Sequence, residues 1–235
     1  MIFHIARPYA QALETQTILT EIGLKSYILS PAEVIYDVAQ SGLFVDKIKS
    51  SDGLIFTSIH ALKALENFSK NQFENFQGKI FVVGDKTYDA AKAIGFHNIF
   101  KADADNSTAL SAYISEKFSG RLIYGAGKFR KPHIEEKLGQ NLDVFELYEA
   151  RARDAFDANE LSHFSHSQEN HILCFSQRMY EITFDLLKTS AETRHLSVIW
   201  HIISSDDTKN ASLKNSDEHF FYASPHDLYH KLRHI

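Results

Sequence analysis

Short apolar runs alternate along the chain with longer segments in which apolar residues recur every three or four positions. The short runs predict buried strands, and the longer periodic segments predict amphipathic helices. Strand and helix follow one another along most of the chain, which is typical of parallel sheets covered by helices. The predicted strands are residues 2–6, 26–29, 54–57, 79–83, 98–100, 121–124, 143–147, 172–175, 197–203 and 219–222.

Turn and capping residues set the predicted helix ends. Pro8 stands where the first residue of a helix would, and Gly23 ends that helix. Gly95 ends another helix, and Ser107 caps the start of the next. The predicted helices are residues 8–23, 59–68, 87–94, 107–118, 132–138, 177–188 and 225–232.

A weak internal repeat organises these elements. Residues 53–58 (GLIFTS) resemble residues 171–176 (HILCFS), and a helix follows each segment. The middle of the chain supplies five strands, whereas the C-terminal part supplies only three. Because three parallel strands make a poor two-faced sheet, we expect the first two strands of the chain to complete the second sheet.

The predicted fold is therefore α/β, with two similar lobes that each hold a parallel five-stranded sheet flanked by helices. A linker of two segments would join the lobes and act as a hinge beside a ligand-binding cleft. The expected boundaries are residues 1–36 plus 168–235 for a discontinuous lobe, 51–148 for a continuous lobe, and 37–50 and 149–167 for the linkers.

Composition narrows the class of protein. The chain has 235 residues, of which 44% are apolar and 23% are charged, as in ordinary globular proteins. The uncharged apolar runs are too short to span a bilayer, and the N-terminus lacks the pattern of a signal peptide. With a single cysteine, Cys174, no internal disulfide can form. We therefore expect a cytoplasmic protein. Separately, the spacings of the histidines show no metal-binding pattern.

The charge distribution indicates the kind of ligand. A net charge of −5 argues against nucleic acid as a partner. Lys128, Arg130 and Lys131 nevertheless cluster around a glycine turn, and such a local basic surface suits a small anion. Charges of this kind are also common on solvated protein surfaces, so the cluster alone does not establish a site.

Several predicted strands end in a polar turn that opens a helix. Thr57 and Ser58 follow one strand, Gly84 and Thr87 follow the next, and Ser176 follows the matching strand of the other lobe. Helix starts carry unpaired backbone N–H groups and a partial positive charge, so they bind anions. Plain N-capping explains any one of these turns. Several of them at one cleft would favour a ligand with many carboxylates or phosphates.

Other chemistries find little support in the sequence. The turn Gly125-Ala126-Gly127-Lys128 has neither the spacing of a phosphate-binding loop nor that of a dinucleotide fingerprint. Ser58 lacks the surroundings of a catalytic serine, and Cys174 lies in a predicted buried strand, where it is expected to be a core residue.

The order and spacing of these motifs resemble the uroporphyrinogen-III synthase family over nearly the whole chain. The matching segments are Arg7-Pro8, residues 54–58 (LIFTS), residues 82–87 (VVGDKT), Ser107-x-x-Leu110, Gly127 with Arg130-Lys131, residues 144–148 (VFELY) and Phe175-Ser176. One stretch departs from the family pattern. Residues 202–208 (IISSDDT) lack the glycine of the family's second glycine–threonine turn, and Asp206 and Asp207 would repel a polyanion there, which leaves a role for Thr208 in doubt.

The resemblance implies a lyase that converts hydroxymethylbilane to uroporphyrinogen III with inversion of ring D and loss of water. It implies no cofactor and no metal, a small-molecule substrate that the upstream bilane-forming enzyme could transfer, and no nucleic-acid or membrane partner. It implies that Tyr148 is the catalytic acid, although a hinge-packing aromatic is an equal alternative. The substrate-binding residues that it implies are Arg7, Thr57, Ser58, Gly84, Thr87, Lys128, Arg130, Lys131 and Ser176.

Two other classes of protein remain as alternatives. The first is a noncatalytic, two-lobed protein that binds a small anion. The second is a receiver-like or flavodoxin-like signalling domain, which is disfavoured because no pair of aspartates follows an early strand and no flavin phosphate loop is present.

Overall fold

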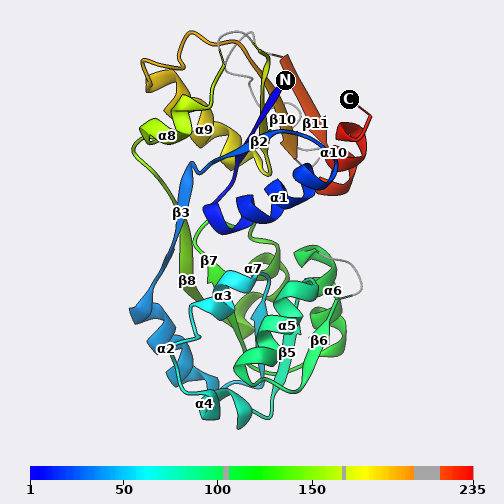
Figure 1. Cartoon of the computed structure of the whole chain (residues 1–235). Helices are drawn as coiled ribbons and strands as arrows, with labels where there is room; N and C mark the ends of the chain where they lie inside the picture. Colours follow the sequence, from blue (N-terminus) through cyan, green and yellow to red (C-terminus); the bar gives the residue numbers. More distant parts are fainter. Residues whose placement is uncertain (103–105, 166–167, 204–217, 235) are drawn as a thin grey trace. The chain divides into compact units, whose positions relative to one another are not determined.

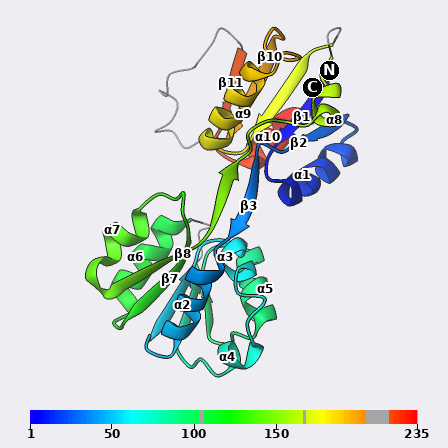
Figure 2. The ribbon, with the colours of Figure 1, turned by 90° about the vertical axis from the view of Figure 1, so that its left-hand side faces the viewer.

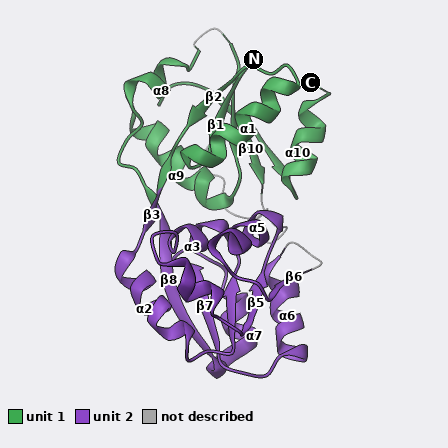
Figure 3. Cartoon of the chain, turned by 60° about the horizontal axis from the view of Figure 1, so that its bottom comes forward, with its two compact units in different colours: residues 1–33, 151–235 green, residues 34–150 purple. Residues whose placement is uncertain are grey.

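The structure is a computed structural model that describes residues 1–102, 106–165, 168–203 and 218–234. It divides into two compact units (Figure 3). Unit 1 comprises Met1–Glu33 and Arg151–Ile235, and unit 2 comprises Val34–Ala150. The chain therefore passes between the units twice.

Unit 1 contains a five-stranded parallel sheet with the strand order β11-β10-β9-β1-β2. Its central strands β1 and β9 are buried along their whole length, as expected for strands with helices on both faces. The strands are β1 (Ile2–Ala6), β2 (Ser26–Leu29), β9 (Asn170–Cys174), β10 (Val198–Ile203) and β11 (Glu218–Tyr222). The helices are α1 (Tyr9–Glu21), α8 (Ala158–Ser162), α9 (Gln177–Thr189) and α10 (Pro225–Leu232).

Alternating side chains of β1 belong to different cores. Phe3 and Ile5 pack with apolar residues of α1 and α10, whereas Ala6 packs with those of α9. Helix α9 supplies Tyr180, Phe184 and Leu187, which recur at helical spacing and lie in one apolar cluster. The period of two along the strand and the period of about 3.6 along the helix thus produce a three-layer unit.

Unit 2 contains a six-stranded sheet with the order β3-β8-β7-β4-β5-β6. Five of its strands are parallel. The strands are β3 (Ala32–Tyr36), β4 (Gly53–Phe56), β5 (Lys79–Val82), β6 (Ile99–Lys101), β7 (Leu122–Gly127) and β8 (Leu142–Ala152). The helices are α2 (Val38–Ile48), α3 (Ile59–Lys63), α4 (Lys70–Glu74), α5 (Asp85–Ile94), α6 (Ser107–Lys117), α7 (His133–Leu138) and the 3₁₀ turn η1 (Gly139–Asn141).

The sixth strand, β3, is a difference from the expected five strands. β3 and β8 lie side by side (Figures 1 and 2). The N–H of Asp37 donates to the carbonyl of Leu147 at 2.9 Å, and the N–H of Arg153 donates to the carbonyl of Pro31 at 3.0 Å. As the residue number rises along one strand it falls along the other, so β3 is antiparallel to β8. β3 lacks a clean apolar alternation, and this explains why its sequence gives no strand signal.

Helices cover both faces of the sheet in unit 2. Apolar residues of α2, α3, α4 and α5 form one core with the inward side chains of β4, β5 and β7. Residues of α6 and α7 form a second core on the other face. The arrangement places the start of α3 and the start of α5 directly after the carboxyl ends of β4 and β5.

The segments expected as linkers contain regular structure. Residues 37–50 hold α2, whose N-cap Asp37 accepts a hydrogen bond from the N–H of Gln40 and whose Phe44 is fully buried. Residues 149–167 hold the end of β8 and α8, and Phe156 and Phe164 of this segment belong to the core of unit 1. The helix signals here are short, and the burial of these rings depends on partners distant in sequence.

Helix ends agree with the sequence at some positions and differ at others. Gly95 caps α5 in the left-handed conformation, with φ of 116°. Pro8 is the N-cap of α1 rather than its first residue, and Asn106 rather than Ser107 caps α6. α3 ends at Lys63 instead of residue 68, because the chain continues in turns with hydrogen bonds between residues three apart.

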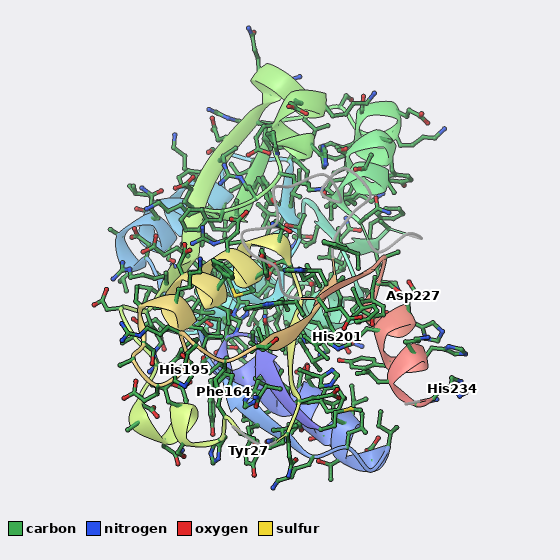
Figure 4. All side chains as sticks on the ribbon, turned by 90° about the horizontal axis from the view of Figure 1, so that it is seen from above. Tyr27, Phe164, His195, His201, Asp227 and His234 are labelled. Carbon is green, nitrogen blue, oxygen red and sulfur yellow. The ribbon has the colours of Figure 1, made fainter. Side chains whose placement is uncertain are left out.

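Three buried histidines, His4, His171 and His201, lie on neighbouring strands of the sheet in unit 1. His201, labelled in Figure 4, lies between His171 and Tyr222, with its Nε2 2.9 Å from Nδ1 of His171 and its Nδ1 2.9 Å from the Tyr222 hydroxyl. His4 stacks on Phe164 and bonds to Asn170. Burial lowers the pKa of His4 to about 4 and that of His201 to about 3. Both imidazoles are therefore neutral at pH 7.

We predict that unit 1 loses stability in mild acid. The unfolded chain takes up protons at these histidines below about pH 6.5, while the folded unit does not until the pH approaches 4 or 3. The free energy of unfolding should therefore fall as the pH drops below about 6.5, by about 1.4 kcal/mol per pH unit for each histidine. Urea unfolding of the His201→Gln protein should show a shallower fall than the parent. The His226→Gln variant, at an exposed histidine of unit 1, is the matched control. Equal slopes for His201→Gln and the parent would contradict the prediction.

Candidate active site

The candidate site lies at the carboxyl edge of the sheet in unit 2. Thr57 and Ser58 follow β4, Gly84 follows β5, and Gly127 ends β7. Tyr148 of β8 is paired with Gly127. β4, β5 and β7 end at this edge, and β8 passes it at Tyr148 and continues to Ala152. Residues expected at separate turns are therefore collected where ligands bind in open α/β sheets.

A β-bulge orients Tyr148. Along β8, Glu146 pairs with Ala126 and Tyr148 pairs with Gly127, so Leu147 is an extra residue in the ladder. Leu147 and Tyr148 consequently both pack in the core that contains α3. In a regular strand these two neighbours would lie on opposite faces of the sheet.

Gly127 makes room for the Tyr148 ring. A Cβ atom at position 127 would lie 2.7 Å from Cζ and 2.8 Å from the hydroxyl oxygen of Tyr148. Real Cβ contacts are not this short. The close approach of the Tyr148 ring therefore requires glycine at this position, a reason that the sequence around Gly127 does not reveal.

Ser58 lies beside the phenol of Tyr148. Burial raises the pKa of Tyr148 above its usual value near 10, while the hydrogen bond from Ser58 and the charge of Arg130 lower it in part. Ser58 Oγ accepts the N–H of His60 at 3.3 Å and caps α3. The remaining hydroxyl hydrogen of Ser58 can point at the phenol oxygen, which leaves the phenol hydrogen available to another group.

Thr57 is tied to a residue that the sequence does not single out. Its Oγ1 lies 2.8 Å from the hydroxyl of Tyr124, which comes from the buried strand β7. Burial raises the pKa of Tyr124 to about 12 in spite of this bond. In the sequence Tyr124 is one apolar position of a predicted strand. Its hydroxyl contact with Thr57 can be recognised only from the folded structure.

Arg130 is held by acidic side chains. Its Nε donates to Glu135 at 2.6 Å, and its Nη1 donates to Glu146 at 3.0 Å and to the carbonyl of Gly127 at 2.8 Å. Burial acts against the charge of Arg130, but the bonds to Glu146 and Glu135 raise its pKa. The guanidinium thus fastens the end of β7 to α7 and β8, which differs from the expectation of an open anion-binding group.

The two lysines of the predicted basic cluster are on the surface. Lys128 Nζ lies 3.1 Å from a carboxylate oxygen of Glu149, and its side chain is about half exposed. Lys131 is exposed as well. The side chain of Glu149 is only 17% exposed, so displacing Lys128 from it would disturb a largely buried carboxylate. The exposed Lys128 ammonium can instead contact an incoming carboxylate while it stays beside Glu149.

The turn after β5 is more enclosed than expected. Gly84 caps α5 with φ of 78°, a conformation that favours glycine. Thr87 lies in the first turn of α5 and is only 4% exposed. Asp85 occupies the first helical position and pairs with Lys101. A carboxylate therefore already stands at the start of this helix.

Two predicted site residues belong to unit 1. Arg7 follows β1, donates to Thr15 Oγ1 at 3.0 Å and lies 4.1 Å above the ring of Phe175, and burial lowers its pKa. Ser176 caps α9, with its Oγ 3.2 Å from the N–H of Met179. The turn at residues 204–208 lies outside the described residues.

Other features of the described residues bear on the alternatives. Over this part of the chain, no cluster of three or more His, Cys, Asp or Glu side chains could hold a metal ion. No described helix is long and apolar enough to cross a membrane. Cys174 is fully buried, and burial raises the pKa of its thiol, so it is a core residue as expected.

We predict that Gly127→Ala destabilises unit 2 by about 1–3 kcal/mol, because the new methyl group must displace the Tyr148 ring or the β7 backbone. Gly42→Ala is the matched control, since a Cβ at position 42 of α2 meets nothing within 4 Å and alanine favours helices. Urea unfolding of the two variants measures the difference. A Gly127→Ala protein as stable as Gly42→Ala would show that the ring is not confined as described.

A family model described as uroporphyrinogen-III synthase HemD matches residues 14–205. No curated protein sequence matches the chain. Among solved structures, a mutant uroporphyrinogen III synthase from the extremely thermophilic bacterium Thermus thermophilus is similar, with 11% identity, a TM-score of 0.53, and coverage of 100% of this chain and 96% of that chain. Another structure titled Thermus thermophilus uroporphyrinogen III synthase has 14% identity, covers 99% of this chain and 97% of that one, and gives a TM-score of 0.43.

At 11% identity the structural likeness shows the α/β fold alone, with parallel sheets flanked by helices. The family match covers most of the chain and agrees with the motifs found in the sequence. The resemblance predicted from those motifs is therefore confirmed: the chain belongs to the uroporphyrinogen-III synthase family.

Proposed function

We propose that the chain is a lyase that converts hydroxymethylbilane to uroporphyrinogen III, with inversion of ring D and loss of water. Family membership supports the reaction. The observation that carries the mechanism is the Ser58–Tyr148 pair at the carboxyl edge of the sheet, with the ring seated on Gly127. No cofactor takes part, because the pyrrole nitrogens of the substrate supply the electrons that expel the hydroxyl group.

Tyr148 donates the proton with which the hydroxyl group departs as water. Its raised pKa keeps the phenol protonated at pH 7, so the acid form is always present. A phenol is a weak acid, and transfer therefore accompanies cleavage of the C–O bond instead of preceding it. Ser58 donates to the phenol oxygen and stabilises the negative charge that grows there during transfer.

The carboxylates of the substrate bind to exposed lysines, to polar turns and to the start of a helix. In unit 2, the exposed side chains of Lys128 and Lys131 contact substrate carboxylates, and the turns at Thr57 and Gly84 add polar contacts. In unit 1, the start of the 13-residue helix α9 at Ser176 offers backbone N–H groups. Arg7 supports this turn through Phe175, and Thr87 supports α5 from within.

The setting of the reaction follows from its chemistry. The substrate closes on itself spontaneously to the uninverted isomer, so we propose a cytoplasmic enzyme that takes the bilane directly from the enzyme that forms it. A noncatalytic anion-binding protein would leave the bilane to close without inversion.

We predict that Tyr148→Phe lowers turnover of hydroxymethylbilane by about 10²–10⁴-fold, because it removes the proton donor while keeping the ring and its packing. The melting temperature and product affinity should stay near those of the parent. The released product, separated by chromatography, should shift toward the uninverted isomer. Tyr113→Phe is the matched control, since its ring stacks on Phe100 in the other core of unit 2. Near-normal turnover by Tyr148→Phe would return this tyrosine to a structural role.

We predict that Ser58→Ala lowers turnover by roughly tenfold or less, because one hydroxyl contact is worth about 0.5–1.5 kcal/mol. The effect should vanish in the Tyr148→Phe background, where no proton leaves a phenol. Turnover of the two single variants and the double variant measures this coupling. A thousandfold loss from Ser58→Ala would instead indicate a nucleophilic serine.

A further inference from the structure

We propose that His60, held by Tyr36, is a positioning residue for Tyr148. This inference rests on the proposed role of Tyr148 as the acid. Neither residue was expected at the site. His60 lies in α3, the helix that follows the motif at residues 54–58, and Tyr36 ends β3, the strand absent from the sequence-based topology.

His60 meets the Tyr148–Ser58 pair in two ways. The centre of its ring lies 5.5 Å from that of Tyr148, with the ring planes inclined by 43°. Its backbone N–H donates to Ser58 Oγ at 3.3 Å, and Ser58 is the hydrogen-bond partner of the Tyr148 phenol. A rotation of α3 would therefore move Ser58 beside the phenol, and a rotation of the imidazole would change its contact with the Tyr148 ring.

Tyr36 fixes the imidazole. Its hydroxyl lies 3.1 Å from Nδ1 of His60. The register of β3 and β8 places Tyr36 directly opposite Tyr148, because Asp37 is bonded to Leu147. Side chains directly opposite each other in an antiparallel pair lie on the same face, and they are closest where no ladder bond joins the two residues. His60 thus packs beside a cross-strand pair of tyrosines.

Packing alone does not require histidine at position 60. The neighbouring buried positions of α3 are Ala61 and Leu62, whereas His60 is only 8% exposed and carries two ring nitrogens. Burying an imidazole is costly unless its nitrogens have partners. The bond to Tyr36 offsets this cost. A buried histidine held in this way has a use at position 60 if it fixes the orientation of the Tyr148 ring beside it.

The charged groups around the cluster leave it neutral at pH 7. Burial, and then the charge of Lys63, lower the pKa of His60. Burial, and then Glu66 and Tyr148, raise the pKa of Tyr36. A neutral imidazole can keep a lone pair on Nδ1 for the Tyr36 hydroxyl. The geometry of the cluster is therefore stable over the pH range in which the phenol of Tyr148 remains protonated.

The test compares variants that break the Tyr36–His60 bond with one that keeps it. Tyr36→Phe and His60→Phe remove the bond but leave an aromatic ring in place. His60→Gln retains an amide that can accept from the Tyr36 hydroxyl. We expect Tyr36→Phe and His60→Phe to lower kcat by about three- to tenfold with KM unchanged, and to raise the fraction of uninverted product, while His60→Gln recovers part of the loss.

The decisive measurement repeats the substitutions in the Tyr148→Phe background. A positioning residue acts through the phenol, so Tyr36→Phe and His60→Phe should have no further effect on kcat there. Equal losses in both backgrounds, or no loss in either, would overturn the proposal. Tyr36→Phe lies at a partly exposed position, which keeps the test available if His60→Phe fails to fold.

The outcome also separates this inference from the proposed function. Full turnover by Tyr148→Phe alone would remove the acid role, and with it the need for a positioning residue. Impaired Tyr148→Phe together with unimpaired Tyr36→Phe and His60→Phe would leave the acid role intact and refute the positioning role alone. Tyr9→Phe, at an exposed tyrosine of unit 1, controls for loss of a hydroxyl group elsewhere.

Discussion

The candidate site depends on the absence of a side chain at position 127. Tyr148 occupies the space where a Cβ of residue 127 would project, and the bulge at Leu147 turns its ring toward α3. Without the bulge, Leu147 would pair with Gly127 and the phenol would face the other core. Without the glycine, the ring could not approach the β7 backbone. The contacts of the phenol with Ser58 and His60 follow from these two features of the backbone.

The end of β7 also explains why Arg130 of the basic cluster is held by protein groups. Arg130 neutralises Glu135 and Glu146 and binds the carbonyl of Gly127, so it stabilises the glycine turn from outside. The guanidinium of Arg130 is mostly buried between two well-placed carboxylates, whereas the side chain of Lys128 is about half exposed and can contact a further carboxylate. Arg130 thus maintains the glycine turn, whereas Lys128 has an exposed side chain that can contact a ligand.

Much of the fold could be predicted from the sequence, because strong periodicity marks buried elements. β2 and α10 have the predicted bounds, and the parallel arrangement of the five-stranded sheet follows from counting strands. β3 could not be predicted in this way, since an edge strand with mixed burial has no clear alternation and its pairing depends on β8, more than a hundred residues away. The buried residues of α2 recur at helical spacing, but the topology deduced from counting strands assigned residues 37–50 to a linker, and α2 was not predicted.

The candidate site could be predicted only in part for the same reason. Motifs at strand ends indicate Ser58, Gly127 and Tyr148, because the carboxyl edge of a parallel sheet collects such residues. Tyr36 and His60 have no motif. Their relation to Tyr148 comes from an antiparallel register and from one turn of helix, which are properties of the folded chain. The partners of Arg130 are likewise separated along the sequence and meet only when β8 lies beside β7.

The electrostatics of the site favour a tyrosine over a carboxylic acid as the proton donor. A substrate with many carboxylates brings negative charge close to the acid, and like charge raises the pKa of any acidic group near it. Burial already raises the pKa of Tyr148, so both effects hold the phenol in its protonated form. A carboxylic acid would need a pKa increase of about three units to remain protonated at pH 7, whereas a phenol needs none. In the proposed reaction, the weak acidity of the phenol is acceptable because the pyrrole electrons of the substrate drive the departure of the hydroxyl group. The proposed donor needs only to supply a proton at the position of the leaving oxygen. The constraint on the protein is then geometric more than electronic, which is consistent with a phenol fixed by a glycine, a bulge and a neighbouring serine.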